Sequence, residues 1–156
     1  MLKTFLSLLL LLAAPQADVF KVFKKEMAPL QSAVDTVVTS TGSQVLQRSR
    51  AAYVEGYGIV VTLEVAFETP QNIFSSPKSS AEVRSLVAQR RKDVQEKVTA
   101  LVKQRVATTD SMGPMDSLAI VIHVLNTNPA DIPNLPVQIL MIAKKESPQQ
   151  VAYREF

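Results

Sequence analysis

Residues Tyr53–Phe67 read YVEGYGIVVTLEVAF, and this stretch decides the fold class. From Tyr57 onward, apolar or aromatic residues occupy every odd position through Phe67, whereas glycine, small and polar residues fill most even positions. Alternation with a period of two, rich in β-branched side chains, predicts a strand with one buried face. If this strand continued backward, Glu55 would fall on the buried face, where an unpaired carboxylate is costly.

Gly56 and Gly58 offer a way to keep Glu55 out of the core, and they are two of the four glycines in the chain. A turn at this point would pair Val45–Val54 with Tyr57–Phe67 as a β-hairpin. The alternatives are a bulge at one of the glycines, or a continuous strand in which the glutamate has a special role. We predict a turn or bulge at Gly56 and Gly58, with Glu55 facing water.

A first helix is predicted before this hairpin. The apolar spacing over Glu26–Val38 fits one helical face, and Pro29 fits a first turn, where its missing N–H is not needed. The preceding residues, Asp18–Lys25, alternate apolar and basic side chains. They fit either a short strand or the beginning of the same helix.

A second helix and two more strands are predicted after the hairpin. Ser79 and Glu82 have the spacing of a capping box, which predicts a long helix over residues 80–107. Two compact apolar runs, Leu118–Leu125 and Val137–Ala143, then predict strands. The order αββαββ predicts an α+β fold with a mainly antiparallel sheet of about four strands and two helices packed on one face. The repeated order also suggests two related αββ halves, a hypothesis that requires the halves to superpose.

The N-terminal segment predicts export. Residues 1–17 combine a short basic stretch, an apolar run and small residues, which is the pattern of a signal peptide cut after Ala14 or Ala17. An uncleaved N-terminal anchor is the alternative. Residues 18–147 would then form one α+β domain, and residues 148–156 a loosely held C-terminal tail.

Composition narrows the function classes. The chain has no cysteine, one histidine and a formal net charge of +3. An exported domain without cysteine favours a bacterial protein that is periplasmic or secreted. Its small net charge gives little attraction to nucleic acid, so we expect no nucleic-acid partner. We expect no cofactor and no metal site, because His123 has no other ligand-type residue at suitable spacing.

The candidate catalytic residues are His123 and Glu55. An imidazole is a common general base, and Glu55 lies between two tyrosines in the sequence, so either could serve a small hydrolase. The chain carries no Gly-x-Ser-x-Gly elbow and no glycine-rich phosphate loop. Whether the protein is an enzyme stays open, and the sequence leans toward a non-catalytic protein.

The predicted helix over residues 80–107 carries a basic face that includes Arg84, Arg91, Lys92 and Lys103. This face could meet an acidic partner or make weak contact with an anionic membrane surface, or it could simply be solvated. The leading hypothesis is an exported, non-catalytic binding or envelope-accessory protein. Its partner would be another envelope or secreted protein, bound at an exposed strand edge. The alternatives are the small hydrolase and a peripheral membrane-surface protein.

Overall fold

The computed structural model describes residues 16–68 and 78–156, so most of the predicted signal peptide lies outside the described residues. The described chain is an α+β fold with one more strand than predicted. The elements in order are α1 (Gln16–Thr39), β1 (Gln44–Val54), β2 (Gly58–Ala66), α2 (Ser80–Thr108), β3 (Ser117–Val124), β4 (Gln138–Lys144) and β5 (Val151–Glu155).

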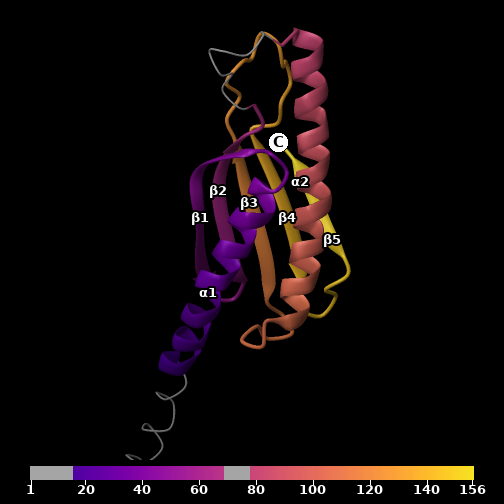
Figure 1. Ribbon diagram of the computed structural model, residues 1–156. Helices are drawn as coiled ribbons and strands as arrows, with labels where there is room; N and C mark the ends of the chain where they lie inside the picture. Colours follow the sequence, from indigo (N-terminus) through magenta and orange to yellow (C-terminus); the bar gives the residue numbers. More distant parts are fainter. Residues whose placement is uncertain (1–15, 69–77) are drawn as a thin grey trace, which may run out of the picture.

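The five strands form one sheet in the order β1-β2-β3-β4-β5. Three neighbouring pairs are antiparallel, as predicted, but β2 and β3 are parallel. A parallel pair needs a long connection that returns the chain to the starting end, and α2 provides it. Both helices lie on the same face of the sheet (Figure 1).

The parallel pair also decides the duplication hypothesis. Because β2 is antiparallel to β1 and parallel to β3, β1 and β3 run in opposite directions. The two halves can be compared by superposing β3 on β1 so that both strands run in the same direction and the helix-covered faces coincide. In this superposition β2 lies on one side of the shared strand and β4 lies on the other side. The two αββ halves are therefore not superposable, and the hypothesis of a duplication is wrong.

The core lies between the helices and the covered face of the sheet. The odd-numbered residues of β2 predicted to be buried do point there, and Ile59, Val61, Leu63 and Val65 are each at most 2% exposed. Valines spaced mostly four residues apart supply the helical side of the core, and the fully buried ones are Val34, Val38, Val94, Val98, Val102 and Val106.

The connection between β1 and β2 explains both glycines. The Tyr57 N–H donates to the Val54 carbonyl at 3.0 Å, which closes a tight turn. Gly56 has φ +75° inside this turn, and Gly58 has φ +120° directly after it. A Cβ on Gly58 would lie only 2.2 Å from the Ser117 carbonyl oxygen of the parallel strand β3. The turn therefore requires the first glycine, and the close approach of β3 requires the second.

Helix α1 includes Asp18–Lys25, so the second of the two alternatives for these residues is correct. Because the helix begins at Gln16, Pro29 lies inside it and not in its first turn, where the sequence predicted it. An internal proline removes one helical hydrogen bond. The early turns are held by packing, because the Phe23 ring is 1% exposed and stacks on Tyr53 of β1 with centroids 4.1 Å apart.

Helix α2 begins where the sequence predicted. The Ser79 hydroxyl accepts from the Glu82 N–H, and the Glu82 carboxylate accepts from the Ser79 N–H at 2.7 Å. This reciprocal pair satisfies two N-terminal donors, which confirms the predicted capping box.

The C-terminal residues differ from the loosely held tail predicted over residues 148–156. A turn in which the Gln150 N–H donates to Ser147 reverses the chain, and Val151–Glu155 then pair with β4 as strand β5. The prediction failed because a strand of five residues is too short to be stable by itself, so its local sequence pattern is a weak signal. Its structure depends on the unpaired backbone groups that β4 presents.

Candidate binding edge at strand β5

The outer side of β5 presents unpaired backbone groups. Gln138 and Phe156 exchange both backbone hydrogen bonds, at 3.3 and 3.0 Å. The alternation of an antiparallel ladder then directs the N–H and C=O groups of Val151, Tyr153 and Glu155 away from β4. The sheet ends at β5, and no further strand of the described residues pairs with it. These outward groups are called the open edge below.

The opposite edge of the sheet, at β1, is irregular and tied to α1 in its first half. Its register shifts twice within Val45–Arg50. The Ser49 N–H donates to the Asp35 carboxylate of α1 at 2.9 Å, and the Gln31 side chain of α1 donates to the Ser49 carbonyl at 3.1 Å. Bulges and a covering helix both hinder the addition of another strand. The β1 edge is therefore irregular in its first half and regular only over Arg50–Val54, whereas β5 pairs in one register over its whole length.

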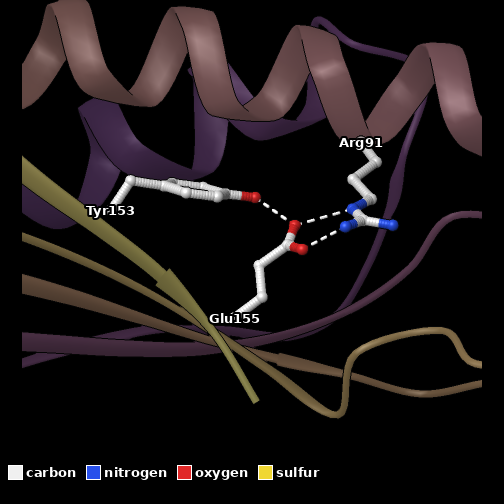
Figure 2. Close-up of polar contacts among 3 residues, drawn as sticks. All are labelled: Arg91, Tyr153 and Glu155. Atoms are coloured by element: carbon white, nitrogen blue, oxygen red, sulfur yellow. Dashed lines mark hydrogen bonds and ion pairs between the residues drawn. The ribbon is translucent and has the colours of Figure 1, made fainter.

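A polar cluster ties β5 to α2, as Figure 2 shows. Arg91 on α2 donates through Nε to Oε1 of Glu155 at 2.6 Å and through Nη2 to Oε2. The Tyr153 hydroxyl donates to the same Oε1 atom. The three residues are called the β5 clamp. They fix the edge strand through a bidentate ion pair, the strongest geometry available to such a pair.

The protonation of the β5 clamp follows from its partial burial. Burial alone would raise the pKa of Glu155, but the hydrogen bonds from Arg91 and Tyr153 outweigh it, so the pKa of Glu155 is lowered. Burial, together with the nearby Glu155 carboxylate, raises the pKa of Tyr153 to about 12. The hydrogen bond to Glu155 raises the pKa of Arg91. At neutral pH the clamp therefore holds a carboxylate, a guanidinium and a neutral phenol.

A pocket of about 320 Å³ adjoins the end of β5, next to the β5 clamp. The loop between β3 and β4 forms one wall, and this loop is anchored because Ser80 at the start of α2 donates to the Asp131 carboxylate at 2.5 Å. Apolar side chains at the pocket are accessible, with Val137 68% and Phe156 59% exposed. The lining residues are Arg91, Asn134, Leu135, Pro136, Val137, Glu155 and Phe156.

The four cations of the predicted basic face have different surroundings. Arg84 donates to a backbone carbonyl of the β3–β4 loop at 3.4 Å, and Arg91 belongs to the β5 clamp. Lys92 lies 3.9 Å from a carboxylate one turn along the helix, and Lys103 is partly buried. Because two of the cations are engaged within the fold and a third has a nearby carboxylate, the face is less basic than the sequence indicates.

The two candidate catalytic residues lie far apart. His123 pairs with Glu64 toward the end of β2, whereas Glu55 is exposed in the turn that precedes Gly58. The six residue steps from Gly58 to Glu64 along β2 correspond to about 20 Å. The structure therefore does not bring His123 and Glu55 into one site. In the ranges that the structure describes, no group of three or more metal-binding side chains comes together.

The β5 clamp was only partly visible in the sequence. Arg91 was selected as a surface cation, but its partner Glu155 lies 64 residues away in the segment predicted to be a loose tail. The only local signal was the spacing of Val151, Tyr153 and Glu155 at every second position, which a strand requires of side chains on one face.

Comparison with known proteins gives no further guide to function. No protein-family model matches the chain, and no curated protein or solved structure is significantly similar to it. None of the described helices is both long and apolar enough to cross a membrane.

Proposed function

We propose that this chain is an exported, non-catalytic binding protein of the bacterial periplasm or exterior. It would add an extended segment of another envelope or secreted protein to the open edge of β5. The contrast between the two sheet edges supports this proposal. The first half of the β1 edge is bulged and tied to α1, while the β5 edge is regular over its whole length and unpaired on its outer side in the described chain. Unpaired edge groups bind an added strand through main-chain hydrogen bonds.

The β5 clamp would contribute to binding by holding the edge in place beforehand. A flexible five-residue strand would lose conformational freedom on binding, and that loss would weaken the complex. The ladder to β4 and the ion pair between Arg91 and Glu155 limit this loss. A structural role for the β5 clamp also fits its chemistry. The charges of Arg91 and Glu155 compensate each other, and the clamp leaves no free nucleophile or base.

The pocket beside the β5 clamp would provide selectivity. In strand addition the backbone supplies affinity, and pockets for alternate side chains select the sequence. The pocket near Val137 and Phe156 is partly apolar and adjoins the end of the open edge. We expect the added segment to place an apolar side chain there. The export of this protein rests on the N-terminal sequence pattern and is part of the same proposal.

The test compares Val151→Pro with Val151→Ala in cells. Both substitutions replace the Val151 side chain. Proline also removes an outward backbone N–H from the open edge, whereas alanine keeps that N–H. A photoreactive amino acid at Ala152, exposed on β5, would report contacts at the edge, and one at Ala100, exposed on α2, would report background. Mass spectrometry would identify the crosslinked peptides.

We expect one partner to crosslink through an extended segment at Ala152, in the wild-type chain and in Val151→Ala. We expect the proline variant to lose that crosslink while circular dichroism shows a folded protein. Equal crosslinking by the proline and alanine variants would exclude strand addition at β5. Crosslinks found only at Ala100 would place the binding surface on α2.

A further inference from the structure

The face of the sheet opposite the helices is called the uncovered face, and its residues follow from the strand registers. Across all five strands, one row is apolar at every position. The residues of this row are Ala52, Val60, Ala119, Ile142 and Ala152. The side chains of Val60 and Ile142 are partly exposed, those of Ala52 and Ala152 are exposed, and Ala119 at the centre is buried. Four of the five residues of the apolar row therefore reach the surface of the described fold.

The adjacent row has a different pattern. Thr62, Val121 and Leu140 occupy its centre, and an arginine stands at each end, Arg50 on β1 and Arg154 on β5. Both arginines are exposed. These two rows thus combine an apolar centre with a positive charge on each side, and the next row of the uncovered face is polar, with Gln47, Glu64, His123 and Gln138.

The parallel pair β2–β3 makes this exposure unusual. Parallel strands are generally covered on both faces, because the connections between them place helices there. Here the described helices cover one face only (Figure 1). Val60 and Val121 lie in the centre of the parallel pair on the other face and are partly exposed. A partner that covered these side chains would complete the usual arrangement.

The two arginines are far enough apart for a helix to lie between them. Their backbones are four strand spacings apart, or about 19 Å. An α-helix with its side chains is about 10–12 Å wide. A helix lying along β3 would cover Val60, Val121, Leu140 and Ile142. The long side chains of the arginines could then reach its two flanks.

We propose that the uncovered face binds an amphipathic helix of a partner protein, with acidic residues on both flanks of its apolar side. Charge complementarity selects this occupant over a second copy of the chain. If two copies packed face to face with their strands aligned, Arg50 of one would face either Arg50 or Arg154 of the other. This surface shares Ala152 and Arg154 with β5 but uses their side chains, whereas strand addition uses the outward backbone groups of the open edge, so the proposal does not depend on strand addition.

The test titrates the full chain with each of two synthetic 18-residue helical peptides and monitors binding by NMR. Both carry the same leucine face, but one has glutamate on its flanks and the other lysine. We expect the glutamate peptide to bind about tenfold more tightly. Shift changes should centre on Val60, Val121, Leu140 and Ile142. The preference should decrease at high salt, because the arginines are exposed.

Two variants separate this surface from general charge effects. The double variant Arg50→Glu and Arg154→Glu should reverse the preference, so that the lysine peptide binds more tightly. The control Lys92→Glu changes an exposed residue of α2, outside the uncovered face, and should keep the original preference. Equal affinity for the two peptides, binding of neither, or shifts confined to another surface would overturn the proposal. Concentration-dependent dimerisation of the chain that Leu140→Asp abolishes would also overturn it, in favour of a second copy.

Discussion

The ion pair of the β5 clamp should stabilise the fold measurably. The perturbation is a double-mutant cycle with Arg91→Met, which keeps most of the apolar stem, and Glu155→Gln, which keeps the shape and removes the charge. The matched control is the pair Lys92 and Glu96 on the outer side of α2, changed in the same way to methionine and glutamine. Both cycles remove one positive and one negative charge, so they differ mainly in geometry and burial.

The expected magnitude follows from geometry and exposure. Arg91 and Glu155 make a bidentate contact, and their side chains are 38% and 22% exposed. Charge-assisted hydrogen bonds contribute about 1.5–3 kcal/mol when sheltered, and solvent screening reduces that here to a coupling of about 1 kcal/mol. Lys92 and Glu96 are 3.9 Å apart and 68% and 65% exposed. Their coupling should be about 0.3 kcal/mol.

Urea unfolding followed by circular dichroism measures both couplings. Because the pKa of Glu155 is lowered below 4.5 in the folded state, its contribution is complete above about pH 4.5. It disappears as the pH falls through the folded-state pKa. The Arg91–Glu155 coupling should therefore be constant near neutral pH and decrease in acid.

Two results would refute this reasoning. The first is a coupling between Arg91 and Glu155 no larger than that between Lys92 and Glu96, which would mean that the bidentate contact adds nothing. The second is a coupling that persists unchanged at a pH well below the folded-state pKa of Glu155. A charge-dependent contact must weaken when the carboxylate is protonated.

Three further predictions concern the stability of the fold. Gly58→Ala should lower the free energy of unfolding by about 3 kcal/mol or more, because the new Cβ would overlap the Ser117 carbonyl. Gly56 has open space around it, so Gly56→Ala should lower the free energy of unfolding by only about 1 kcal/mol, which is the cost of its positive φ. Urea titration of the two variants checks this order. Since the pKa of Tyr153 is raised to about 12, its contribution to stability should be complete below about pH 10 and lost as the pH rises through 12. Partial exposure limits this loss to about 1 kcal/mol, and Tyr153→Phe should not show it in alkaline urea titrations. Ser79→Ala should lower the thermal midpoint by about 3 °C, because α2 loses its N-cap, while an unchanged midpoint would show that the cap contributes nothing.

The features that the sequence predicted well are local. The hairpin depends on alternation and on two glycines within a few residues of the turn, and α2 begins at a capping box that spans the four residues Ser79–Glu82. Such features are set by the conformations of neighbouring residues. The sequence left Asp18–Lys25 open between a short strand and the start of α1, because Pro29 is typical of a first turn. The stacking of Phe23 on Tyr53, 30 residues along the chain, is a tertiary contact.

The candidate binding edge could not be predicted in the same way. The sequence identified Arg91, but the contact that matters joins it to Glu155 near the end of the chain. Strand β5 itself forms because β4 offers an unpaired side. An edge strand of five residues gains much of its stability from such a template and little from its own preference.

By itself, the sequence determined the α+β class, the hairpin around Gly56 and the capped start of α2, because periodicity and turn chemistry act over a few residues. The tertiary structure alone decided that β2 and β3 are parallel, that β5 ends the sheet and that the uncovered face is apolar between two arginines. The physical reason is that strand order and register arise from contacts between residues distant in sequence. The packing of α2 selects among arrangements that local preferences leave equally allowed.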